Sequence, residues 1–317
     1  MLTTHMDTVE ASNYTRDPWG AEIEAGRLYG VGAADAKAQI AAFVYAVYAL
    51  RKAGISLAGR ITLAFVVDEE PGACSPYGTR YLLEQGVLDG DAAIIGEPGN
   101  RMIALGHRGI YRFRIQITGE STHTGRKAWE QGVQGRNAIL DMASLALALS
   151  EYPLPESRSE SFPNRKSVLT FPTFIRGGSG INVVPGSCEA YGDVRLLPGL
   201  SVDAIKNIIK DQLERLAIEN YQLDDLLFVP AAETNQQTAI VQALANTVEM
   251  MTGIRPRLEG SGPACDGWMF ITRGIPTVCG YGVTYGGVHG ADEWVDLESL
   301  HTITEAYAHT IHQYLGV

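Results

Sequence analysis

Short apolar runs recur along the chain, and each leads into a polar or charged residue. The four runs and the residues that follow them are LTT (2–4) before His5, ITLAFVV (61–67) before Asp68-Glu69-Glu70, AAIIG (92–96) before Glu97, and IPTVCGYG (275–282) before His289. Runs of this length without alternation are typical of strands buried on both faces, as in a parallel sheet covered by helices. Because open α/β sheets bind ligands at the carboxyl ends of their strands, we expect these polar residues to meet there.

Helix-like stretches lie between and after these runs. Residues 37–54 are apolar on most sides and stop at Gly54, which predicts a buried crossover helix, and residues 237–252 and 298–314 also have helical patterns. The middle of the chain differs, because residues 108–119 and 188–198 alternate like strands with one wet face. Together with helix-like residues 137–150 and 202–218, they predict a small α+β domain of the ferredoxin-like kind.

The predicted fold is therefore α/β, with a mostly parallel sheet and an inserted α+β domain. We assign residues 1–107 and 229–317 to the discontinuous larger domain and residues 108–228 to the insertion. A length of 317 residues suits two domains.

Composition narrows the choice of partners. The formal net charge of −11 argues against nucleic acid and against anionic membrane surfaces. Neither a long charge-free apolar run nor a signal-peptide pattern is present, so we expect a cytoplasmic protein. The four cysteines form no CxxC pair, and we interpret them as buried small hydrophobic residues: Cys74, Cys188, Cys265 and Cys279.

Single motifs say little. The stretch GVGAAD (30–35) is similar to a dinucleotide fingerprint, but Asp35 stands where glycine or alanine is needed for close helix packing, and no GxSxG is present. Five motifs in order are more specific: HMDTV, YGVGAADAK, VVDEEPGA, IIGEP and GGVHGADEWV. In this combination the chain resembles the M20 metallopeptidase family, which includes acetylornithine deacetylase, succinyl-diaminopimelate desuccinylase, aminoacylases and dipeptidases.

The resemblance implies a zinc-hydrolase catalytic domain that holds two Zn²⁺ ions. It places His5 and Glu97 on one ion, Glu70 and His289 on the other or the reverse, with Asp35 bridging. Charge supports two ions, because three ligand carboxylates and two Zn²⁺ sum to +1, which a bridging hydroxide neutralises. The motifs offer no basic partner that we recognise for so many acids, and Co²⁺ or Mn²⁺ could replace zinc.

The resemblance also assigns roles around the metal. It implies that Glu69 is the general base and that Asp7 orients His5, which suits two residues spaced two apart at a strand end. In the insertion it implies that His123 reaches the partner subunit's active site and binds the oxyanion; a surface loop histidine is the alternative.

Substrate contacts are expected from the segment GGSGINVVPGSCEAYGDVR (177–195). Asn182 would contact the substrate's carboxylate and Gly178 would give backbone room. Arg195 would suit a carboxylate as a planar bidentate donor, or it has a structural role only. Asp266 matches a family aspartate loosely, and its role stays open.

The function that we predict is hydrolysis of the amide bond of an N-acyl amino acid, of the deacetylase or desuccinylase type, by a homodimer that pairs through the inserted lid and dimerisation domain. A dipeptidase or carboxypeptidase of the same family is the alternative, and a non-catalytic truncated paralogue is a third reading. The sequence does not name the acyl group, the amino acid or the physiological metal.

The position of HMDTV is unusual for this family, whose members carry several dozen residues before it. We therefore expect either that Met1 lies inside a strand and is not the true start, or that the chain is a shortened paralogue.

Overall fold

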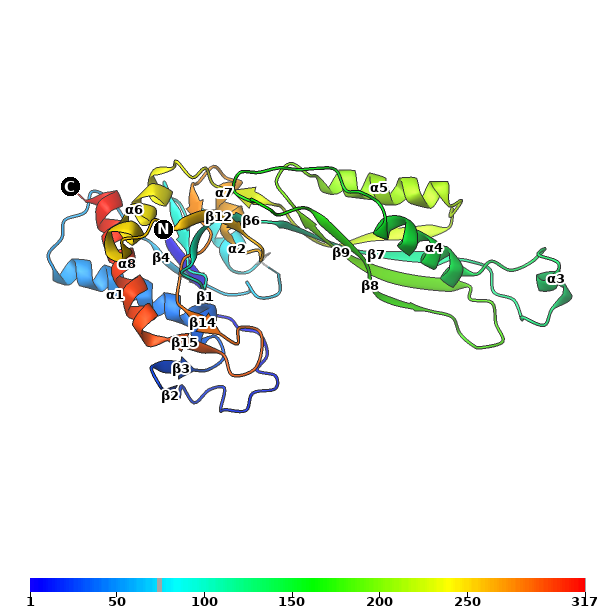
Figure 1. Cartoon of the computed structure of the whole chain (residues 1–317), viewed down its shortest axis with the longest axis horizontal. Helices are drawn as coiled ribbons and strands as arrows, with labels where there is room; N and C mark the ends of the chain where they lie inside the picture. Colours follow the sequence, from blue (N-terminus) through cyan, green and yellow to red (C-terminus); the bar gives the residue numbers. More distant parts are fainter. Residues whose placement is uncertain (73–75, 317) are drawn as a thin grey trace. The chain divides into compact units, whose positions relative to one another are not determined.

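A computed structural model describes residues 1–72 and 76–316 of the chain, so the prediction for Cys74 lies outside the described residues. The chain forms two compact units (Figure 1). Unit 1 comprises Met1–His107, Glu160–Pro163 and Ala232–Val317, and unit 2 comprises Arg108–Ser159 and Asn164–Ala231. The predicted fold class, a parallel α/β sheet with an inserted α+β unit, is confirmed.

Unit 1 is built on a four-stranded parallel sheet in the order β13-β5-β1-β4. The strands are β1 (Leu2–His5), β4 (Leu63–Val66), β5 (Ala93–Ile95) and β13 (Thr277–Val278). Each falls within one of the four apolar runs or overlaps it, as the sequence pattern predicts. Ile94 on β5 is buried against one side of the sheet and Ala93 and Ile95 against the other, which explains why these runs show no alternation.

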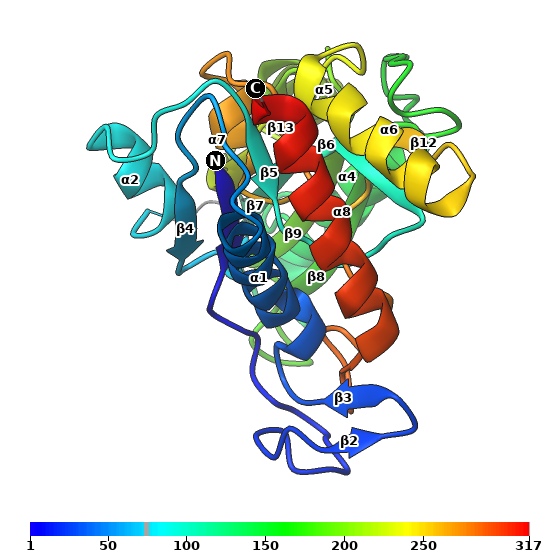
Figure 2. The same cartoon turned by 90° about the vertical axis from the view of Figure 1, so that its left-hand side faces the viewer.

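Helices cover both faces of this sheet. One face packs against the helices α1 (Ala38–Lys52), α6 (Ala239–Thr252) and α8 (Leu297–Leu315), and Figure 2 shows α1 and α8 side by side. Phe43 of α1 and Tyr307 of α8 are fully buried with ring centroids 4.6 Å apart. The other face packs against the short helices α2 (Thr79–Glu84) and α7 (Gly267–Ile271).

Two smaller sheets complete unit 1. In one, β6 (Met102–His107) lies between β11 (Ala232–Glu233) and β12 (Arg257–Ser261). The other has the order β14-β15-β3-β2, with β14 (Tyr285–Gly286), β15 (Trp294–Asp296), β3 (Arg27–Tyr29) and β2 (Ile23–Glu24). In the second sheet, β3 from near the start of the chain pairs with β15 from near its end. The irregular turn η1 (Ala33–Lys37) follows shortly after β3.

Unit 2 is an antiparallel sheet in the order β10-β7-β9-β8, with helices on one face (Figure 1). Its strands are β7 (Gly109–Thr118), β8 (Val168–Gly177), β9 (Ser187–Leu196) and β10 (Tyr221–Val229), and its helices are α3 (Lys127–Glu130), α4 (Ala138–Ser150) and α5 (Val202–Arg215). Alternate residues of β7, from Tyr111 to Ile117, are fully buried under α4 and α5, which is the one-wet-face pattern that the sequence predicts.

Two short segments differ from the predicted division into domains, and one of them, residues 229–231, belongs to unit 2 and not to the larger domain. Residues 160–163 fall within the predicted insertion, yet they belong to unit 1. Phe162 is buried there because it lies over Gly260 of β12, where a Cβ atom would come within 2.1 Å of its ring. The lack of a side chain at Gly260 makes room for the phenylalanine.

Across residues 1–72 and 76–316, no helix is long and apolar enough to cross a membrane.

Candidate metal centre

The register of the parallel sheet brings the first polar residues together. Thr3 of β1 pairs with Ile95 of β5, so His5 and Glu97, each two residues further on, follow at the same edge. The hydroxyl of Thr4 donates a hydrogen bond to the carbonyl of Gly96 at 2.7 Å and fastens the two strand ends to each other. His5 also pairs with Val66 of β4, so the acids 68–70 leave the sheet beside it.

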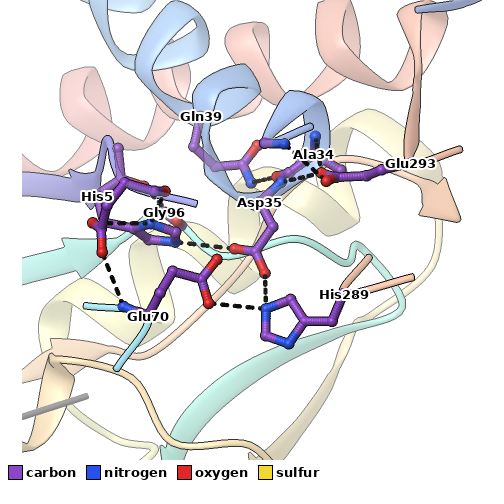
Figure 3. A network of polar contacts seen from close by, with 11 residues as sticks. His5, Ala34, Asp35, Gln39, Glu70, Gly96, His289 and Glu293 are labelled. Atoms are coloured by element: carbon purple, nitrogen blue, oxygen red, sulfur yellow. Dashed lines mark hydrogen bonds and ion pairs between the residues drawn. The ribbon is translucent and has the colours of Figure 1, made fainter. Parts of the chain in front are cut away.

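Two groups of potential ligand atoms lie at this edge, and Asp35 of η1 belongs to both. One group is His5, Asp35 and Glu97; the other is Asp35, Glu70 and His289, and within each group the ligand atoms lie within 4.8 Å of one another. His5 Nε2 lies 3.0 Å from Asp35 Oδ1, while His289 Nε2 lies 3.3 Å from Asp35 Oδ2 and 3.0 Å from Glu70 Oε2 (Figure 3). Asp35 therefore presents one oxygen to each histidine.

The acids change the proton affinity of both histidines. Burial lowers the pKa of His5, but hydrogen bonds with Asp35 and Asp7 and the charges of Glu97 and Glu69 outweigh it and raise the pKa to about 12. For His289, the hydrogen bond with Asp35 is the main cause that raises the pKa to about 9. Both imidazoles thus carry a proton at neutral pH in the metal-free chain.

Burial acts in the opposite direction on two of the carboxyl groups. Burial, with the charges of Asp35 and Glu69, raises the pKa of Glu97 well above its usual value. Burial and the charge of Asp266 raise the pKa of Glu69 to about 8. For Asp35, burial is outweighed by hydrogen bonds with the two histidines, which lower its pKa to about 2.

Asp7 lies beside His5. Its backbone carbonyl is 3.0 Å from His5 Nδ1 and its Oδ1 atom 3.6 Å, and its Oδ2 atom accepts a hydrogen bond of 3.1 Å from the backbone N–H of Glu70. Asp7 is therefore in contact both with a candidate ligand and with the backbone of the segment that carries the next one.

The donor set fits a pair of metal ions. Imidazole nitrogens and carboxylate oxygens suit zinc, manganese and cobalt, and one carboxylate lies between the two groups. Glu97 supplies an independent observation, since its Oε1 atom is buried and has no hydrogen-bond partner among residues 1–72 and 76–316. A buried carboxylate oxygen without a donor is costly, and a bound cation would satisfy it.

In unit 2, the structure brings together two of the predicted residues. His123 and Val183 form an isolated β-bridge, and Asn182 Nδ2 lies 3.3 Å from His123 Nε2. The His123 Nδ1 atom accepts a hydrogen bond of 3.0 Å from the backbone N–H of Gly125, which leaves Nε2 as the ring nitrogen beside Asn182.

The other predicted contacts of unit 2 lie on or next to its sheet. Gly178 adopts a positive φ of +81°, and its nearest neighbours would lie 3.6 Å or more from a Cβ atom, so backbone conformation is what favours glycine there. Arg195 of β9 already forms an ion pair with Asp193, from Nε to Oδ1 at 2.8 Å. Burial and the nearby charges of Arg165 and Arg195 lower the pKa of Arg108. Three arginines therefore lie near the single carboxylate of Asp193, and the local charge is positive.

Sequence reasoning missed two residues beside the metal centre. Lys37 is a basic partner within the YGVGAADAK motif: burial lowers its pKa, and the carboxylates of Glu293, Asp7, Asp35 and Glu70 act on it in the opposite sense. Glu293 is 2% exposed and binds the backbone of the turn that carries Asp35 (Figure 3). Both residues lie inside quoted motifs, but nothing in the local sequence separates either of them from a solvated charge.

Asp266, whose role the sequence left open, lies in the same unit. It is 3% exposed, and its Oδ2 atom accepts a hydrogen bond of 2.5 Å from the hydroxyl of Thr79. Burial raises the pKa of Asp266 to about 6. Its proximity to Glu69 is evident from the effect of its charge on that group.

Comparison with known proteins identifies the family. The model of peptidase family M20/M25/M40 matches residues 1–313. The succinyl-diaminopimelate desuccinylase of Methylorubrum extorquens (strain PA1) is 31% identical, and the match covers 98% of this chain and 81% of that protein. The enzyme of the same name from Gluconacetobacter diazotrophicus is 28% identical, with coverage of 98% and 80%.

Solved structures share the fold at lower identity. The aminopeptidase PepT of Bacillus cereus has a TM-score of 0.77 and 23% identity, with 99% of this chain and 80% of that one covered. A dinuclear metal-binding M20 peptidase of Bacillus subtilis has a TM-score of 0.72 and 17% identity, with 98% and 79% covered. The predicted resemblance is confirmed over nearly the whole chain, and the protein belongs to the M20/M25/M40 peptidase family of metal-dependent hydrolases.

Proposed function

We propose that this chain hydrolyses the amide bond of an N-acyl amino acid with two metal ions, Zn²⁺ in the first instance, held by His5, Asp35, Glu70, Glu97 and His289. The observation that carries the proposal is the position of Asp35, whose two carboxylate oxygens face two different ligand groups. The ions would supply a water of lowered pKa and polarise the scissile carbonyl.

Glu69 is the general base of the proposed reaction. Its carboxylate accepts the proton of the attacking water and passes it to the leaving nitrogen. Burial and the charge of Asp266 raise the pKa of Glu69 in the metal-free chain, and the charge of two bound cations would lower it again and leave the carboxylate free to accept a proton. Asp7 holds the His5 ring from behind and, through the N–H of Glu70, also orients the segment that carries the base.

Unit 2 supplies the remaining contacts in the proposal. His123 donates to the oxyanion from the partner subunit, and Asn182 contacts the substrate's carboxylate beside it; the 3.3 Å approach of their side chains supports a joint role. The arginines around Asp193 provide positive charge for a carboxylate, and Arg195 is the residue assigned to it.

A homodimer would form through strand β8. This strand pairs with β9 alone among the described strands, and its exposed side chains include Phe174 and Ile175, which are 53% and 45% exposed. An unpaired edge with apolar side chains is a surface that another strand can extend.

A desuccinylase or deacetylase is favoured over a dipeptidase or carboxypeptidase because the curated relatives at about 30% identity are named succinyl-diaminopimelate desuccinylases. The test is to assay the zinc-loaded chain with N-succinyl and N-acetyl amino acids and with free dipeptides. Faster cleavage of dipeptides would reverse the assignment. Loss of turnover in Glu69→Ala with both ions still bound is expected, and a chain without turnover on any of these substrates would favour the non-catalytic reading.

A further inference from the structure

Glu293 is a buried carboxylate that accepts three hydrogen bonds from one turn of the backbone. Its Oε2 atom accepts from the N–H of Gly32 at 2.8 Å, and its Oε1 atom accepts from Ala34 at 2.8 Å and from Asp35 at 2.9 Å. The residue is 2% exposed. A charge so deeply buried is tolerated because three N–H donors replace its water.

The turn that Glu293 holds is the one that presents Asp35 to both ligand groups. Gly32 adopts a positive φ of +72°, and Asp35 and Ala36 have non-helical backbone angles inside η1, so the turn departs from regular helix geometry. The backbone carbonyl of Glu293 also accepts the N–H of Gly30 at 3.0 Å. Residues 30 to 35 are therefore bound to Glu293 at both ends.

The same residue is close in sequence to another candidate ligand. His289 lies four residues before Glu293, in a segment that is folded back on itself: a Cβ atom at Gly287 would lie 2.7 Å from the carbonyl oxygen of Ala291. The segment that carries His289 is thus anchored, through one side chain, to the turn that carries Asp35. His289 Nε2 and Asp35 Oδ2, which these two segments carry, lie 3.3 Å apart.

We infer that Glu293 is a positioning residue that sets the geometry of the metal site formed by Asp35, Glu70 and His289. It does not contact an ion; it holds the backbones of two ligand-bearing segments at one spacing. The inference rests on the proposed function, because it assumes that these three residues bind a metal.

The test is Glu293→Gln in the full chain, with Asp292→Asn as the matched control. Glutamine has the size of glutamate but replaces one acceptor oxygen with an NH₂ group, which faces a backbone N–H. Asp292 is the adjacent acid, and its Oδ1 atom accepts from the N–H groups of Thr15 and Arg16 at 2.9 and 3.0 Å, away from the metal centre. The readouts are the affinity for zinc, measured in competition with a chromophoric chelator, and the visible spectrum of the cobalt-loaded chain.

We expect Glu293→Gln to bind the ion at the Asp35, Glu70 and His289 site roughly 10–100-fold less tightly, with an altered cobalt spectrum and with activity that excess metal restores. Asp292→Asn should match the wild type in all three. A Glu293→Gln chain with wild-type affinity and spectrum but a lower Tm would overturn the inference, because the residue would then be structural only. Glu293→Asp, which keeps the charge and loses reach, serves the same comparison if the glutamine variant does not fold.

The wild-type chain separates this inference from the proposed function. If it binds two ions and Glu293→Gln binds them equally well, only the positioning role fails. If the wild type binds neither ion, the proposed function fails and the positioning role fails with it.

Discussion

Loading the centre with metal should expel protons, and the structure indicates how many. In the metal-free chain the pKa of His5 is about 12 and that of His289 about 9, because the carboxylates around them stabilise the imidazolium forms. A metal ion binds only the neutral ring, so each histidine must lose its proton before it can act as a ligand.

At pH 7 both imidazoles are protonated, so complete loading should release about two protons from the histidines. Glu97 adds to this number wherever its raised pKa leaves it protonated. Because protons compete with metal ions for the histidine nitrogens, the affinity for metal rises with pH. For two protons, the product of the two binding constants should rise about 100-fold per pH unit near neutrality. The slope should become shallower above about pH 9, where His289 is already neutral.

Isothermal titration calorimetry in buffers of different ionisation enthalpy measures this number directly. The metal-free chain is titrated with zinc at pH 7, and the slope of observed enthalpy against buffer ionisation enthalpy gives the protons released. His289→Ala should release about one proton fewer. The matched control is His301→Ala, since His301 lies on α8 with its side chain 77% exposed and pairs with Glu305 of the same helix.

A slope of zero for the wild type would refute the reasoning, since it would mean that both histidines are neutral before metal arrives. Release that is unchanged in His289→Ala but reduced in His301→Ala would refute the assignment of the protons. The first result would show that the acids of the centre do not hold imidazolium in the metal-free state, and the second would show that His289 is not the source of a released proton.

Three further predictions concern single residues. Burial raises the folded-state pKa of Glu69 to about 8, so the neutral carboxyl group stabilises the metal-free fold below about pH 4.5, and this contribution is lost as the pH rises to about 8. In chemical denaturation, Glu69→Gln should lose less stability than the wild type over that pH window. An identical pH profile for the two chains would contradict this prediction. Tyr307→Phe should lower the free energy of unfolding by about 1–3 kcal/mol, because the buried hydroxyl of Tyr307 donates a hydrogen bond to the carbonyl of Tyr281 and the variant removes this donor. Urea denaturation measures the change, and an unchanged free energy of unfolding would count against that bond. His123→Ala should keep both metal ions but lose turnover by about 100-fold or more, and a full rate in kinetic assays would remove its oxyanion role.

The sequence was most informative where one physical constraint fixes both pattern and position. A strand buried on both faces must be apolar throughout, so LTT and AAIIG predicted β1 and β5, and parallel register then places His5 beside Glu97. The wet face of β7 was equally readable from its alternation. These features depend on local pattern and on the ordering of strands alone.

The parts that could not be predicted depend on long-range contacts of single side chains. Glu293 binds N–H groups 258 to 261 residues away in sequence, and nothing local distinguishes it from a solvated acid. In the sequence, Phe162 belongs to a polar loop rich in proline and serine, and only its contact with the distant Gly260 explains why it is buried. Lys37 was overlooked because its relation to the acids arises only once η1 turns back toward them.

If Asp35 is shared by two cations as proposed, the two ligand groups cannot be loaded independently. A carboxylate that gave one oxygen to each of two cations would not be fully available to both, so occupancy of one position would alter the binding free energy of the other by a coupling term that is equal in both directions. The first cation would also cancel most of the negative charge that attracts the second. Loading would then be stepwise, with a singly loaded species between the empty and the complete centre, and a substitution on either side of Asp35 would change binding at both positions.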